Sequence, residues 1–213
     1  MHGYYAARAP EYDAVYRKPE RQADLRLIES WLPALLAGCT VLEIACGTGY
    51  WTQFLAPVAR RVVALDAAPE TLAIARTRVP ADRVELITGD AYALPARLGS
   101  FDAVFAGFWF SHVPRARRVE FLAGVARAAA PGARVVLLDN RFVPGSSTPL
   151  SERDAAGDTW QLRTLQDGSS HHVLKNFPTE AELQQAVASV GGSGRWHEWA
   201  HYWAFEYETL PHA

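Results

Sequence analysis

The sequence predicts an α/β fold of the doubly wound, Rossmann-like class, in which a mainly parallel sheet is covered by helices on both faces. Apolar runs of strand length alternate with helical stretches between residues 41 and 139. These runs lack the apolar and polar alternation of half-exposed strands, which indicates that both faces are buried. A loop of very small residues follows the first run, where such folds bind ligands.

The chain has 213 residues, which is an ordinary length for one domain. We expect a single domain with a helical arm or lid at 1–37, a core at 38–139, an insertion at 140–177 and a C-terminal helix with strands at 178–213. Hydrophobic residues make up 49% and charged residues 21% of the chain, which excludes a disordered or collagen-like chain.

Charge and cysteine content narrow the class of protein further. Lys and Arg number 21 against 23 Asp and Glu, so we expect neither a nucleic-acid nor a membrane partner. Cys39 and Cys46 have no metal-ligand spacing, which predicts two reduced thiols and no metal. The N-terminus lacks an apolar signal region and no apolar run is long enough to span a membrane. We expect a cytoplasmic monomer or homodimer.

Two helices are predicted before the core. Residues 1–20 indicate a helical arm with an aromatic face, because tyrosines recur near helical spacing at Tyr4, Tyr5, Tyr12 and Tyr16. Residues 21–37 repeat leucine and isoleucine at helical spacing and predict a second helix.

The core predicts five buried strands, over residues 41–45, 61–66, 84–90, 101–107 and 133–139. A helix is expected from about Gly49, and another over 69–79 with Pro69 at its first position. A third is expected over 115–129, ending before Pro131.

The last third of the chain does not continue this alternation of strands and helices. Residues 140–157 indicate a loop, and Asp167–Gly168 predicts the turn of a β-hairpin. Thr179 and Glu182 form a capping-box pattern that starts a helix. Residues 195–210 predict two aromatic strands.

The most informative stretch is VLEIACGTGYWT, residues 41–52. Glycine lets the backbone turn sharply and lets a ligand approach it closely. The stretch is not the dinucleotide G-x-G-x-x-G, because Tyr50 breaks that spacing, and no Lys-Ser/Thr pair makes it a P-loop. Asp66 follows at the tip of the next strand, where a carboxylate either binds a ribose or caps the following helix. Gly89–Asp90–Ala91 ends the third strand.

These motifs resemble class I S-adenosylmethionine-dependent methyltransferases, whose first motif is commonly written E/D-x-G-x-G-x-G. Ala45 stands where that motif has its first glycine. The resemblance is to small-molecule enzymes of the type-11-like group and, more weakly, to the methyltransferase domain of ovothiol biosynthesis. It implies a seven-stranded sheet in methyltransferase order, with a small β-hairpin insertion after the fifth strand.

The resemblance also implies the cofactor, S-adenosyl-L-methionine, and the residues that hold it. Asp66 would face the ribose and Asp90 the adenine amino group. The full set of expected cofactor contacts is Tyr16, Glu43, Ala45, Cys46, Gly47, Thr48, Gly49, Asp66, Ala67, Asp90, Ala91 and Phe108.

Candidate catalytic residues follow the fourth and fifth strands. Phe108 and Trp109 either attract a sulfonium and stack a planar substrate or pack in the core. His112 either acts as a general base or bonds structurally to a backbone carbonyl. Arg141 either donates two hydrogen bonds to a substrate carboxylate or forms a surface ion pair. We therefore name His112, Trp109 and Arg141 as catalytic candidates, and leave the hairpin residues Trp160, His171, His172 and Asn176 open between substrate contact and hairpin surface.

The expected function is transfer of a methyl group to N, O or S of a small, planar or heteroaromatic metabolite by SN2 positioning. The alternatives are a non-catalytic module that binds the cofactor, an RNA methyltransferase, and a nicotinamide-dependent reductase, which the loop spacing disfavours. The RNA enzyme lacks support because no basic tract and no Asn/Asp-Pro-Pro-Tyr/Phe signature occurs.

Overall fold

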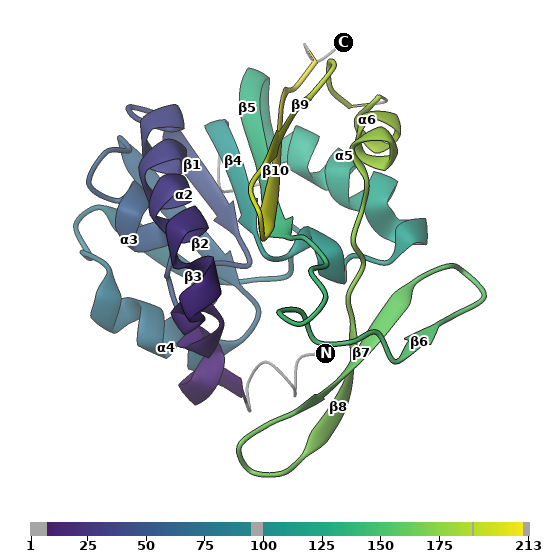
Figure 1. Cartoon of the computed structure of the whole chain (residues 1–213). Helices are drawn as coiled ribbons and strands as arrows, with labels where there is room; N and C mark the ends of the chain where they lie inside the picture. The colour runs from purple at the N-terminus through teal and green to yellow at the C-terminus, as the bar shows by residue number, and fades with distance from the viewer. Residues whose placement is uncertain (1–7, 95–99, 189, 211–213) are drawn as a thin grey trace.

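The computed structural model of the chain describes residues 8–94, 100–188 and 190–210. Tyr4 and Tyr5 of the predicted arm lie outside these ranges. The described residues form one large sheet with helices on both faces, and a small second sheet that extends away from it (Figure 1).

The large sheet has seven strands: β1 (Thr40–Ile44), β2 (Arg61–Asp66), β3 (Val84–Thr88), β4 (Phe101–Gly107), β5 (Ala129–Asn140), β9 (Arg195–Glu198) and β10 (Tyr202–Glu208). Their order is β3-β2-β1-β4-β5-β10-β9. The first five strands run parallel, and β10 runs antiparallel to both β5 and β9. The predicted doubly wound sheet and its two aromatic C-terminal strands are therefore confirmed.

Helices cover the two faces of this sheet. On one face lie α2 (Gln22–Leu35), α3 (Thr52–Leu55) and α4 (Pro69–Arg78); on the other lie α5 (Arg118–Ala128) and α6 (Glu180–Val187). Successive strand residues point to opposite faces, so Val41 packs in the first core and Leu42 in the second. This explains why the strands read as continuous apolar runs.

Local sequence signals account for several helix boundaries. Pro69 occupies the first turn of α4 as predicted, where its missing N–H costs nothing. Thr179 accepts from the backbone N–H of Glu182, and the Glu182 side chain accepts in return, so the predicted capping box is present. The helix predicted from Gly49 has only four residues, and Pro57, directly after the C-cap residue Ala56, prevents it from continuing.

Two other segments differ in detail from the prediction. The arm is helical, as a 3₁₀ helix η1 (Ala9–Arg17) followed by η2 (Pro19–Arg21). The helix predicted over 115–129 is split into η5 (Arg115–Arg117) and α5, and β5 begins at Ala129 rather than at 133.

The insertion after β5 forms the second sheet, from β6 (Glu152–Arg153), β7 (Thr159–Thr164) and β8 (Ser170–Leu174). β7 and β8 pair antiparallel around Asp167–Gly168, which confirms the predicted hairpin. Figure 1 shows this sheet beyond the edge at which the parallel strands end, and the Gln166 N–H of the hairpin turn donates to Glu11 of the arm at 3.1 Å. The insertion and the arm thus meet at the ligand-binding edge.

Candidate functional site

The loop after β1 takes a left-handed backbone at three alternate positions. The φ angles are +56° at Ala45, +57° at Gly47 and +74° at Gly49. Glycine adopts this conformation freely, whereas for alanine it is less favourable by about 1–2 kcal/mol. Gly49 is also crowded, since an added Cβ would lie 3.2 Å from the Cβ of Ala75. Small residues therefore let the loop pack closely at Gly49, while Ala45 and Gly47 line the cavity described below.

Asp66, at the end of β2, organises this loop. One carboxylate oxygen accepts from the Gly47 N–H at 2.8 Å. The other accepts from the Ala68 N–H at 2.9 Å and from the Thr71 hydroxyl at 3.1 Å, at the start of α4. The helix-capping interpretation of Asp66 is thus present in the structure, and the same carboxylate faces the cavity described next.

A cavity of about 220 Å³ lies against this loop, and we call it the glycine-loop cavity. Seven predicted cofactor contacts line it: Ala45, Gly47, Asp66, Ala67, Asp90, Ala91 and Phe108. Tyr12, Tyr92, Trp109 and Arg117 complete much of the wall, with the Arg117 guanidinium 3.6 Å from the centre of the Tyr92 ring.

The other five predicted cofactor contacts lie outside this cavity. Tyr16 stacks on Tyr50, with ring centres 3.5 Å apart, and the cavity position expected for it belongs to Tyr12. The Thr48 hydroxyl is held by Asp13 at 2.6 Å. The remaining three are buried, Glu43 in β1 and Cys46 and Gly49 in the loop itself.

Glu43 is the acid of the first motif, and its side chain is 2% exposed. Burial raises its pKa from the ordinary 4.5 to about 8. The folded chain therefore keeps a proton that the unfolded chain releases above about pH 4.5. We conclude that the carboxyl is largely neutral and supports the loop from below.

Glu43 makes the stability of the fold depend on pH. Because the folded state binds the extra proton, its free energy of unfolding falls as pH rises from about 4.5 to about 8. The slope is at most about 1.4 kcal/mol per pH unit. The glutamine of Glu43→Gln does not titrate, so the stability of the variant lacks this pH dependence. The difference in free energy of unfolding between wild type and variant should therefore change steadily from about pH 4.5 to about pH 8. Urea unfolding at pH 5.5 and 7.5 measures it, and a difference that does not vary with pH would contradict the assignment.

A second cavity of about 360 Å³ adjoins the first, and we call it the basic cavity. Five basic side chains line it: Arg8, Lys18, Arg21, Arg163 and Lys175. Tyr12 and Phe108 line both cavities and form the boundary between them. Phe108 has a left-handed φ of +59°, a strained conformation for a bulky residue.

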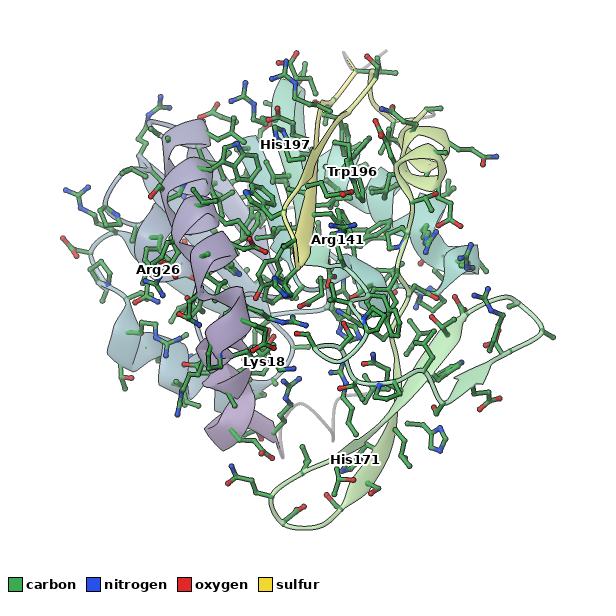
Figure 2. All side chains as sticks on the ribbon, in the orientation of Figure 1. Lys18, Arg26, Arg141, His171, Trp196 and His197 are labelled. Atoms are coloured by element: carbon green, nitrogen blue, oxygen red, sulfur yellow. The ribbon has the colours of Figure 1, made fainter. Side chains whose placement is uncertain are left out.

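The N-terminal arm closes over both cavities. Asp13 pairs with Arg78 and thereby fastens η1 to the glycine loop side. Lys18 and Arg21 bond Ser146, which belongs to the insertion. Figure 2 shows Lys18 at the end of α2 that faces the small sheet. The arm therefore joins the cofactor side to the insertion.

His112 lies in the wall of the basic cavity and is 4% exposed. Its Nδ1 lies 2.6 Å from the carbonyl oxygen of Leu174, which is the structural contact that the sequence allowed. Burial, and then the charges of Lys175 and Arg163, hold the pKa of His112 well below 6.5. The imidazole is neutral and a weak base.

The two other catalytic candidates lie away from the basic cavity. Arg141 pairs with Glu198 at 3.1 Å and donates to the Trp199 carbonyl at 2.8 Å, so the surface ion pair that the sequence allowed is present, and the contact with a substrate carboxylate stays a prediction. Figure 2 shows it beside β10. Trp109 lines the glycine-loop cavity, because its ring packs edge-on against Tyr92 at 6.1 Å.

Sequence reasoning missed a buried ion pair behind the basic cavity. The Lys175 ammonium donates to Asp139 at 2.7 Å and to the Ser111 hydroxyl at 2.6 Å. Burial lowers the pKa of Lys175 to about 8, and Asp139 opposes this shift. The available signal was Asp139 itself, an acid at the carboxyl end of a buried strand. Of the open hairpin residues, Asn176 is buried and binds the Asp158 carboxylate at 2.8 Å.

Comparison with known proteins matches residues 41–132 to the methyltransferase domain family. The chain is 34% identical over 173 residues to the demethylmenaquinone methyltransferase of Oceanobacillus iheyensis, which covers 73% of this chain and 70% of that protein. The structure of DhpI in complex with SAH superposes with a TM-score of 0.81 and 33% identity, over 99% of this chain and 95% of that one. The chain belongs to the class I S-adenosylmethionine-dependent methyltransferases.

This methyltransferase spans about half the length of several curated relatives. One is the demethylmenaquinone methyltransferase of Shouchella clausii, 36% identical over 109 residues, which cover 48% of this chain and 46% of that protein. The family uses S-adenosylmethionine, and the glycine-loop cavity fits that cofactor: small residues line its floor and two carboxylates, Asp66 and Asp90, its wall. In the described ranges, no helix combines the length and the apolar character required to cross a bilayer.

Proposed function

We propose that this methyltransferase transfers the methyl group of S-adenosylmethionine to a small molecule bound in the basic cavity. The observation that carries the proposal is the contact between two cavities, with Tyr12 and Phe108 lining both. A cofactor in one cavity and an acceptor in the other would meet at these two aromatic side chains. DhpI has also been solved as a complex with SAM and HEP, which supports such an arrangement.

When bound, the cofactor supplies an activated methyl group on a sulfonium centre. Asp66 would accept from the ribose hydroxyls and Asp90 from the adenine amine. Tyr12 and Phe108 present aromatic rings at the boundary, where they would attract the positive sulfur by roughly 0.5–2 kcal/mol and exclude water. The chain's contribution is mainly alignment of the two reactants, which supplies on the order of 7–11 kcal/mol in well-oriented reactions.

The planar or heteroaromatic acceptor expected from the sequence receives limited support from the cavity. Its aromatic lining consists of Tyr12, Phe108 and Phe177 within the described residues, beside five basic side chains. Trp109, which favoured a planar acceptor, lines the glycine-loop cavity instead. A small acceptor is the better-supported proposal. The cytoplasmic location and the monomeric or dimeric state stay predictions.

The direct test incubates the purified protein with labelled S-adenosylmethionine and a panel of small acceptors, and follows formation of S-adenosylhomocysteine. We expect saturable S-adenosylhomocysteine binding and transfer to at least one small acceptor. Binding without transfer to any acceptor, including a cell extract, would favour the non-catalytic module. Transfer to RNA alone would favour the RNA methyltransferase.

Asp66→Ala tests the cofactor assignment. The substitution removes the acceptor proposed for the ribose hydroxyls, so affinity for S-adenosylhomocysteine should fall by about 1–3 kcal/mol. Asp102→Ala is the matched control, because that carboxylate accepts from the Thr40 N–H at the opposite end of the strands. Calorimetric titration measures both. If Asp66→Ala and wild type bind S-adenosylhomocysteine with equal affinity, Asp66 does not bind the ribose.

A further inference from the structure

The basic cavity concentrates positive charge from separate parts of the chain. Arg8 precedes η1, Lys18 and Arg21 flank or lie in η2, Arg163 lies on β7, and Lys175 follows β8. Glu11 is the one carboxylate among the described lining residues. In a chain with a formal net charge of −2, this local excess of cations is not a consequence of composition.

Arg21 is the most informative of these cations because it is 3% exposed. Its guanidinium donates to the Asn140 amide oxygen at 2.5 Å and to the Ser146 hydroxyl at 3.0 Å, both neutral groups. Among the described residues no carboxylate forms an ion pair with it, and Glu20 reaches it through the Ser146 hydroxyl. A buried cation held only by neutral partners is costly unless an anion completes the site.

The remaining cations are oriented by neighbours that leave the cavity positive. Asp139 balances Lys175 from behind at 2.7 Å. Arg163 donates to the Gln161 side-chain oxygen at 2.7 Å, which fixes its guanidinium in the cavity wall. Lys18 donates to the Ser146 carbonyl. After the Lys175–Asp139 pair is set aside, the described residues that line the cavity include four basic side chains and one acid, Glu11.

We propose that the acceptor is a small dianion, a phosphonate or phosphate monoester, methylated on one of its anionic oxygens. This inference rests on the proposed function and names its substrate class. A dianion with several acceptor oxygens suits the forked guanidinium of the buried Arg21 and the basic side chains around it better than a single carboxylate does.

The proposed step needs no proton transfer. An anionic oxygen of the acceptor attacks the methyl carbon, the new O–C bond forms, and the C–S bond breaks with its electron pair going to sulfur. The products are S-adenosylhomocysteine and a methyl ester with one negative charge fewer. A neutral, weakly basic His112 is consistent with a nucleophile that arrives already ionised. Because the product carries one negative charge fewer than the acceptor, it would bind to the cavity more weakly, which favours its release.

The test measures binding of methylphosphonate, inorganic phosphate and acetate to the protein loaded with S-adenosylhomocysteine, by calorimetry. We expect methylphosphonate and phosphate to bind and acetate to bind at least about tenfold more weakly. A preference between methylphosphonate and phosphate would separate the two kinds of acceptor. Equal binding of acetate, or no binding of either dianion, would overturn the inference.

Arg21→Met tests the residue that carries the argument. Loss of charged hydrogen bonds should weaken methylphosphonate binding by roughly 10- to 100-fold, while affinity for S-adenosylhomocysteine and thermal stability stay close to wild type. Arg134→Met is the matched control, because Arg134 also donates to a neutral oxygen, the Leu35 carbonyl, but lies outside the cavity. Equal methylphosphonate binding by both variants would contradict the assignment.

An acceptor panel separates this inference from the proposed function. Alkylphosphonates and alkyl phosphates should be methylated, and uncharged phenols and azoles should not. Methylation of uncharged acceptors alone would overturn the dianion and leave the methyltransferase activity standing. Failure to bind S-adenosylhomocysteine would instead remove the proposed function itself.

Discussion

Lys175→Met should destabilise the fold by about 3–5 kcal/mol at neutral pH, because it leaves the carboxylate of Asp139 buried without its counter-ion. Lys175 and Asp139 are 4% and 0% exposed, so solvent cannot replace the lost ammonium. Burial alone would raise the pKa of Asp139, and the charge of Lys175 reverses that shift and holds the pKa below its usual range. In the variant the Asp139 carboxyl can be protonated at low pH, so the loss of stability relative to wild type should become smaller as pH falls. Urea unfolding at pH 5 and 7 measures both effects.

The double variant Lys175→Met/Asp139→Asn is the control for this prediction. It removes both charges and leaves an amide that still accepts from the Asn140 N–H, which Asp139 binds at 2.8 Å. Stability should return to within roughly 2 kcal/mol of wild type, since a neutral replacement of a buried pair is often tolerated. A double variant as unstable as the single one would show that the pair is not the source of the loss.

Gly47→Val should lower affinity for S-adenosylhomocysteine by at least about 100-fold. The φ of +57° is strained for any residue with a Cβ, and worst for a β-branched one. An added Cβ would also lie 3.3 Å from the Tyr12 ring, on the wall of the glycine-loop cavity. The substitution therefore narrows the space that the cofactor needs. Calorimetric titration of the folded variant measures the effect.

Gly132→Val separates backbone strain from loss of cavity space. Gly132 has a φ of +72°, and nothing lies within 4 Å of a Cβ added there. We expect this variant to lose a similar amount of stability and to bind S-adenosylhomocysteine like wild type. If both variants bind equally well, Gly47 does not face the cofactor.

Much of the fold was predictable because local signals agreed with the global arrangement. Four of the parallel strands, β1, β2, β4 and β5, are largely buried on both faces, so they read as apolar runs, whereas β3 lies at the edge of the sheet and is mostly half-buried or exposed. Pro69 and the Thr179 capping box mark two helix starts. The carboxyl ends of β1, β2 and β3 meet at one edge, which is why Ala45, Asp66 and Asp90 line one cavity.

The positive charge of the basic cavity was not predictable, because its basic side chains come from segments far apart in the sequence. Arg21 reads as one more charge at a helix start, and only the fold brings Ser146 and Asn140 against it. Arg141 follows β5 and was expected to face the ligand edge, but Glu198 of the adjoining C-terminal hairpin holds it at the surface. The order of the elements predicted at which edge of the sheet a residue lies, but not the direction in which its side chain points.

The structure places Tyr12, and not the predicted Tyr16, at the wall of the glycine-loop cavity for a similar reason. Both lie on the aromatic face of the arm, and helical spacing does not decide which one reaches the loop. In the structure Tyr16 stacks between Tyr50 and Phe108, whereas the Tyr12 ring lies over Gly47. A 3₁₀ helix turns differently from an α-helix, so the register of the arm could not be read from its sequence.

Titration of the purified chain with S-adenosylhomocysteine tests the whole account most directly. The glycine-loop cavity predicts one saturable binding event per chain, lost with Gly47→Val and weakened with Asp66→Ala. Heat release that never saturates, with no rise in the unfolding temperature at any concentration, would mean that this loop holds no methyl donor.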